Sequence, residues 1–262
     1  MDPILEVTQL SMNFGGIKAL ERVDLHVLPG EITALIGPNG AGKTTFFNCI
    51  TGIYAPTEGD IFITPPGGNR HKINGLSIHK ITERGVARTF QNIRLFPDMT
   101  VLENVMIGRH CRTKAGILGA ILRDNATHKE ELAIVARSYE MIEKIGLSED
   151  VNLLARNLPY GAQRRLEIAR AIATDPFLLL LDEPAAGMNP QETKELEALM
   201  FRIRNEGKIS ILLIEHDMRL VMSLSDCVYV MDYGEMIARG TPQQIRVNPE
   251  VIKAYLGEDV HA

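Results

Sequence analysis

Short stretches of consecutive apolar residues recur along the chain, each bounded by polar or turn-forming residues. They include ITALIG at 32–37, FLLLLD at 177–182 and ISILLIEH at 209–216. Runs of this length are typical of strands buried on both faces of a parallel sheet. Segments with helical apolar spacing follow them, such as QETKELEALMFRIRNEG at 191–207. This alternation predicts an α/β fold in which helices cover a parallel sheet.

Other patterns interrupt this alternation. VDLHV at 23–27 alternates apolar and polar residues, and CVYVMDYGEMIARG at 227–240 predicts a hairpin that turns at Asp232, Tyr233 and Gly234. Residues 98–174 show little strand character and much helical spacing, as in ELAIVARSYEMIEKIGL. We therefore predict one domain over residues 1–262, with its α/β core at 1–97 and 175–262 and a helical subdomain inserted at 98–174.

Composition narrows the class of protein. The 262 residues are 45% hydrophobic and 23% charged with a net charge of −5, a balance typical of a folded globular protein without a general affinity for nucleic acid. A local basic patch at Arg164, Arg165 and Arg170 remains open. The three cysteines have neither disulfide nor zinc spacing, which favours a reducing cytosol. The N-terminus shows no secretory signal, and AGILGAIL at 115–122 is too short to span a membrane.

The strongest chemical signal is GPNGAGKTT, which follows the predicted strand 32–36 and precedes a predicted helix. In this context G-x-x-x-x-G-K-[ST] predicts a loop whose backbone N–H groups and Lys43 bind a polyphosphate, with the Thr44 hydroxyl on Mg²⁺. The candidate ATP-binding residues here are Gly37, Pro38, Asn39, Gly40, Ala41, Gly42, Lys43, Thr44 and Thr45.

Two further predicted strands end in polar residues. Asp182 and Glu183 end the first, where Asp182 could hold Mg²⁺ and Glu183 could activate water, although either acid alone could instead cap the next helix. His216 ends the second and could contact a γ-phosphate or simply bond to the backbone. Because parallel strands present their carboxyl ends at one edge of the sheet, we expect these residues near the phosphate loop.

Gln91 and Phe14 are weaker candidates. Gln91, in ARTFQNIRLF, could join Mg²⁺ to the helical insertion or be a solvated loop residue. Phe14 could stack on a nucleotide base, but a core position is the default for phenylalanine.

Taken in order, these motifs resemble the ATP-binding subunits of ABC transporters, and the resemblance covers nearly the whole chain. GVARTFQNIRLFPDMTVLENV, LDEPAAGMNPQETKEL and LLIEHDMRLVMSLSD are similar to the subunit of high-affinity branched-chain amino acid importers. The resemblance implies a P-loop NTPase core with a parallel sheet, an N-terminal antiparallel β subdomain and an inserted helical subdomain. It implies Phe14 on adenine, Thr44, Gln91 and Asp182 around Mg²⁺, Glu183 as base, and His216 on the γ-phosphate.

The resemblance also implies partners and a location. Such subunits pair head to tail, so that each ATP lies between one phosphate loop and the partner's signature turn. We expect a second ABC ATPase subunit, in a heterodimer or a homodimer, two transmembrane permease subunits, and indirectly an extracytoplasmic solute-binding protein. The expected location is the cytoplasmic side of the bacterial inner membrane, as a peripheral subunit.

The signature turn departs from the family pattern. Where the family has L-S-G-G-Q, this chain has Leu158, Pro159, Tyr160, Gly161 and Ala162. The serine hydroxyl and one N–H are missing, because proline has no N–H. Tyr160, Gly161 and Ala162 remain candidates for contact with a partner's ATP through backbone dipoles.

Two other classes of ABC protein fit the sequence less well. A soluble ABC ATPase acting on DNA or ribosomes usually has two cassettes or a coiled-coil insertion, and a binding-only regulator would lack an intact Glu183. Among transporters, a urea or amide importer and a lipopolysaccharide exporter remain alternatives.

Overall fold

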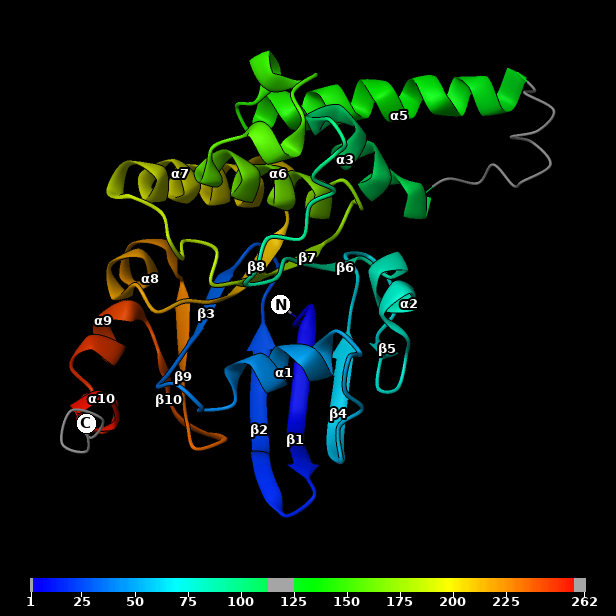
Figure 1. Ribbon diagram of the computed structural model, residues 1–262. Helices are drawn as coiled ribbons and strands as arrows, with labels where there is room; N and C mark the ends of the chain where they lie inside the picture. Colours follow the sequence, from blue (N-terminus) through cyan, green and yellow to red (C-terminus); the bar gives the residue numbers. More distant parts are fainter. Residues whose placement is uncertain (1, 113–124, 257–262) are drawn as a thin grey trace.

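A computed structural model describes residues 2–112 and 125–256 of the chain (Figure 1). Its larger sheet has the strand order β10-β9-β3-β8-β7-β6, and neighbouring strands are parallel except at the β9–β10 hairpin. The strands are β3 (Ile32–Ile36), β6 (Val86–Arg88), β7 (Leu178–Asp182), β8 (Ser210–Ile214), β9 (Cys227–Asp232) and β10 (Glu235–Gly240). The parallel sheet and the C-terminal hairpin predicted from the apolar runs are confirmed.

A second, antiparallel sheet is built mostly from the N-terminal part of the chain. Its order is β2-β1-β4-β5, from β1 (Leu5–Phe14), β2 (Ile17–Val27), β4 (Glu58–Ile63) and β5 (His71–Lys72). The alternating segment 23–27 forms the end of β2, with Val23, Leu25 and Val27 buried. The expected antiparallel subdomain is therefore present.

The helices surround these sheets. They are α1 (Lys43–Ile50), α2 (Ile78–Glu83), α3 (Val101–Arg109), α5 (Asn125–Lys144), α6 (Tyr160–Ile172), α7 (Pro190–Gly207), α8 (Met218–Leu224), α9 (Pro242–Arg246) and α10 (Pro249–Leu256). Short 3₁₀ turns lie at His110–Arg112, Ser148–Asp150 and Ala155–Asn157. Within the described ranges, no helix combines the length and apolar character needed to cross a membrane.

Helices α3, α5 and α6 lie between β6 and β7 in the chain and pack against one another above the parallel sheet (Figure 1). The described part of this segment contains no β pairing except the isolated bridge between Thr100 and Leu154. This agrees with its helical spacing, while the bounds 98–174 stay a prediction. The apolar stretch 115–122 lies outside the described residues.

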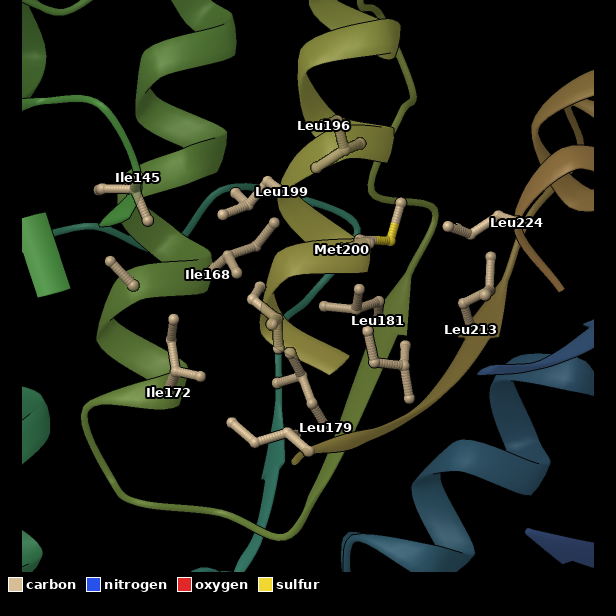
Figure 2. Close-up of a cluster of buried hydrophobic side chains, with 14 of the residues drawn as sticks. Ile145, Ile168, Ile172, Leu179, Leu181, Leu196, Leu199, Met200, Leu213 and Leu224 are labelled. Atoms are coloured by element: carbon tan, nitrogen blue, oxygen red, sulfur yellow. The ribbon is translucent and has the colours of Figure 1, made fainter. Parts of the chain in front are cut away.

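Strand side chains alternate between two cores, one on each face of the parallel sheet. Leu179 and Leu181 of β7 pack with α6, α7 and α8, and Figure 2 shows them beside Met200 and Leu213. Leu178 and Leu180 point to the other core, which contains α1 and the antiparallel sheet. Fully burying each such side chain contributes about 1.5–3 kcal/mol. Burial on both faces explains why the strands read as continuous apolar runs.

Candidate functional site

The phosphate loop connects β3 to α1 and depends on its glycines. Gly37, Gly40 and Gly42 have φ values of +151°, +78° and +104°, in the region that favours glycine. A Cβ at Gly42 would lie 2.6 Å from the carbonyl oxygen of Ala19, so this position also requires close backbone approach. The loop is thus shaped by backbone conformation, as the motif predicts.

The charge of the loop is supplied by Lys43, the first residue of α1. Its Nζ donates to the carbonyl oxygens of Gly37 and Pro38, at 2.7 Å each. The side chain therefore curls over the loop. The first turn of α1 contains no acidic residue, so the loop and helix end remain electropositive.

Glu183 follows β7 directly and lies at the centre of the predicted catalytic group. Its backbone has a φ of +47°, an uncommon conformation for a side chain of this size, and its N–H donates to Ile214 of β8 at 2.9 Å. Gln91 Nε2 donates to Glu183 Oε2 at 2.8 Å, and His216 Nε2 lies 2.8 Å from Oε1. The three residues predicted as catalytic are brought into direct contact, and both carboxylate oxygens of Glu183 are engaged.

Glu183 and His216 face a shared cleft of about 440 Å³ above the phosphate loop, whereas Gln91 is not among the residues that line it. Residues of the loop, the two strand ends and the hairpin turn line it. They are Ile17, Lys18, Ala19, Asn39, Gly40, Ala41, Gly42, Lys43, Thr44, Thr45, Glu183, His216, Tyr233 and Gly234. Chain segments that are distant in sequence therefore form one concave site.

Asp182, the last residue of β7, has a partner that sequence reasoning missed. Arg88 Nη2 of β6 donates to Asp182 Oδ2 at 2.7 Å, with side chains only 6% and 5% exposed. Arg88 also donates to Asn48 and Thr51, at 2.7 and 3.1 Å. The parallel pairing of β6 with β7 places Arg88 beside Asp182, which a sequence motif alone does not indicate.

A second missed acid, Glu215, follows β8. It accepts hydrogen bonds from the backbone N–H groups of Ala185 and His216, at 2.8 and 3.0 Å. Burial raises the pKa of Glu215, and the nearby charge of Glu183 adds to this shift. Glu215 thus holds the turn after Glu183. The sequence could have indicated Glu215 as a site residue, because it stands directly before His216 at the end of an apolar run.

Phe14 and the turn Tyr160, Gly161 and Ala162 lie outside the lining of this cleft, as do Gln91 and Asp182. Phe14 is 40% exposed and packs edge-on against the Tyr54 ring, with centroids 5.1 Å apart. Tyr160, Gly161 and Ala162 form the start of α6, whose N-cap residue Pro159 makes no side-chain capping bond. The proposed roles of these residues stay predictions.

The surface basic patch that the sequence left open at Arg164, Arg165 and Arg170 is not present on α6. Arg164 is fully buried and pairs with Glu167 at 3.0 Å, while Arg165 pairs with Glu195 at 2.7 Å. Arg170 is partly buried, with its guanidinium over the Phe96 ring. These arginines therefore pack against, or pair with, groups of the same chain and do not form a charged surface.

Sequence comparison matches two family profiles. The profile described as ABC transporter matches residues 20–186, and that described as branched-chain amino acid ATP-binding cassette transporter matches residues 235–261.

Individual proteins agree with these matches. The chain is 50% identical to the high-affinity branched-chain amino acid transport ATP-binding protein LivG of Escherichia coli and 49% identical to BraF of Pseudomonas aeruginosa, in each case over 98% of both chains. A solved ATP-binding cassette of an ABC transporter in its ADP conformation superimposes with a TM-score of 0.84 at 31% identity, covering 98% of this chain and 100% of that one.

Proposed function

The chain belongs to the ABC transporter family, and we propose that it is the ATP-hydrolysing subunit that energises uptake of branched-chain amino acids through a membrane importer. The observation that carries the proposal is the cleft shared by the phosphate loop, Glu183 and His216. The choice of substrate is supported by 50% and 49% identity to LivG and BraF over nearly the whole chain.

ATP binding is assigned to the loop Gly37–Thr45. Lys43 exchanges its contacts with loop carbonyls for the terminal phosphates, and backbone N–H groups bind the remaining oxygens. Phe14 at the end of β1 is proposed to stack on the adenine, because its ring is exposed enough to offer a face.

Mg²⁺ is the cofactor that this reaction implies, and the donor set fits a hard cation. Arg88 engages Oδ2 of Asp182, and no hydrogen bond from the described residues reaches its Oδ1. Gln91 uses its amide nitrogen on Glu183, which leaves its oxygen available, and Thr44 lines the cleft. We assign Thr44, Gln91 and Asp182 to hold the ion, which would neutralise phosphate charge.

Hydrolysis requires a base that can accept a proton from water. Glu183 has this capacity, but Gln91 and His216 occupy its two oxygens in the conformation seen here. Each oxygen keeps a second lone pair, so Glu183 can accept a proton from water while these contacts hold. His216 must leave Oε1 before its Nε2 can donate toward the γ-phosphate.

The assembly follows from the same assignment. We propose a second ABC ATPase subunit across the nucleotide, with Tyr160, Gly161 and Ala162 facing the partner's ATP. Two permease subunits and an external solute-binding protein complete the importer, and this chain lies on the cytoplasmic face of the inner membrane. We further propose residues 98–174 as the helical signature subdomain and 1–97 with 175–262 as the nucleotide-binding core.

The test is transport by the purified complex in lipid vesicles. ATP-dependent uptake of leucine, isoleucine and valine is expected, and uptake of urea or short amides alone would contradict the substrate assignment. Glu183→Gln should lower ATP hydrolysis by about 100-fold or more while ATP binding remains, the usual effect of losing a general base. Lys43→Ala should weaken ATP binding itself. Lipopolysaccharide-stimulated ATPase activity without amino acid uptake would favour the exporter instead.

A further inference from the structure

Helix α6 contains a fully buried guanidinium that the proposed function does not use. Arg164 Nη1 donates to the carbonyl oxygen of Phe90, and Nη2 donates to that of Gln91, both at 2.7 Å. The side chain is 0% exposed. Arg164 therefore fixes the backbone of the Gln91 segment directly to α6.

Glu167, one turn further along α6, secures the other end of the same segment. Its Oε2 accepts from Arg164 at 3.0 Å, and its Oε1 accepts from the Arg94 N–H at 3.1 Å. Burial raises the pKa of Glu167. Because carbonyl groups and an N–H of this segment are all bonded to one helix, residues 90–94 follow the position of α6.

The Gln91 side chain connects this segment to the catalytic group. It donates to Glu183 Oε2 at 2.8 Å, so the path from α6 to Glu183 passes through one residue. Tyr160 adds a second link, because its hydroxyl donates to the Ala186 carbonyl at 3.0 Å and lies 3.3 Å from Arg164 Nη2. Helix α6 thus contacts both Gln91 and the turn that follows Glu183.

We propose that Arg164 is a positioning residue for ATP hydrolysis, a role that rests on the proposed function. Through Arg164, the position of α6 determines whether Gln91 contacts Glu183. A shift of α6 relative to β7 carries the Gln91 backbone with it and opens or closes the contact at Glu183 Oε2. Without the guanidinium, the carbonyls of Phe90 and Gln91 are no longer bonded to the helix, and the Gln91 side chain is no longer held beside Glu183.

The experiment is a double-mutant cycle on ATP hydrolysis by the assembled transport complex. Arg164→Met should lower kcat about tenfold or more while KM for ATP stays within about twofold, because the phosphate loop is untouched. In a Gln91→Ala background, Arg164→Met should cause no further loss. Additive losses from the two changes would overturn the proposal, because Arg164 would then act independently of Gln91.

Controls separate positioning from folding. Arg165→Met removes a positive charge from the same helix, but Arg165 pairs with Glu195 of α7, so kcat should stay near that of the unaltered complex. Arg164→Lys keeps a charge opposite Glu167 and one possible carbonyl bond, and it should lose less kcat than Arg164→Met. If Arg164→Met fails to fold, the cycle is run with Arg164→Lys, and an effect on KM alone would again overturn the proposal. Absence of ATPase activity in the unaltered complex would instead refute the proposed function.

Discussion

The ion pair between Arg88 and Asp182 predicts a large loss of stability when Arg88 is replaced by methionine. Methionine keeps an apolar stem against the Phe47 and Phe90 rings, where the guanidinium now lies at 5.4 and 5.1 Å from the centroids. The change leaves the Asp182 carboxylate, whose side chain is 5% exposed, without its cation. The effect is therefore mainly that of an uncompensated buried charge.

The magnitude follows from this geometry. Removing one partner of a buried pair typically costs about 3–5 kcal/mol. Losing the bonds to Asn48 and Thr51 adds little, because the Thr51 hydroxyl still donates to the Phe47 carbonyl and Asn48 is half-buried within reach of water. We expect the free energy of unfolding to fall by about 4 kcal/mol, which at a urea m-value near 3 kcal/mol/M lowers the midpoint by about 1 M.

Urea unfolding of the nucleotide-free chain measures this loss, with Arg137→Met as the matched control. Arg137 pairs with Glu140 on the exposed face of α5, so its replacement should cost less than about 1 kcal/mol. Arg88→Met combined with Asp182→Asn should recover much of the stability, because the unpaired charge is gone. A loss for Arg88→Met no larger than for Arg137→Met, or strict additivity in the double variant, would refute the reasoning.

Other predictions concern the loop, a buried acid and the assembly. Gly37→Ala should lower the melting temperature far more than Gly40→Ala, because a Cβ on Gly37 would lie 1.9 Å from the Met231 carbonyl oxygen, whereas Gly40 faces open space. Burial raises the pKa of Glu215 above its ordinary 4.5, so its contribution to stability is present below about pH 4.5 and is lost as pH rises through the raised pKa; Glu215→Gln should remove this decline in urea titrations run at several pH values. In a heteromeric complex whose partner has a serine in its signature, Glu183→Gln should abolish more ATPase activity than the equivalent change in the partner; equal losses would show that the two sites are equivalent.

Much of the fold was predictable because its signals are local. The strands β3, β7 and β8 are continuous apolar runs, and the glycines of the phosphate loop require their own backbone conformations. The rule that parallel strands share an edge correctly brought Glu183 and His216 together. It did not predict that His216 and Gln91 would bond to Glu183 itself, since side-chain contacts depend on packing that a motif does not encode.

The buried ion pairs were not predictable for a related reason. An arginine in a sequence is most often exposed, so the sequence allows a surface patch at Arg164 and gives no sign that Arg88, in ARTFQN, is buried. Each is buried only because a distant segment supplies an acceptor: Asp182 for Arg88, and the carbonyls of Phe90 and Gln91 for Arg164. These pairs depend on how the parallel sheet and the helical segment pack in three dimensions, which local sequence patterns do not indicate.

Helix α6 contains both the unusual signature turn and the buried Arg164, and the two features are connected. Pro159 provides no hydroxyl and no N–H, and the Tyr160 hydroxyl is directed at the Ala186 carbonyl of its own chain. The Tyr160 side chain therefore makes internal contacts, and the backbone groups of Tyr160, Gly161 and Ala162 remain for a partner's nucleotide. One turn later, Arg164 attaches the same helix to the Gln91 segment. The missing donors imply that this turn binds its partner's ATP weakly. Even a weak contact at the turn can shift α6, and Arg164 then moves the Gln91 segment relative to Glu183 of the same chain. Weak binding by the turn is therefore compatible with coupling through Arg164 in the same helix.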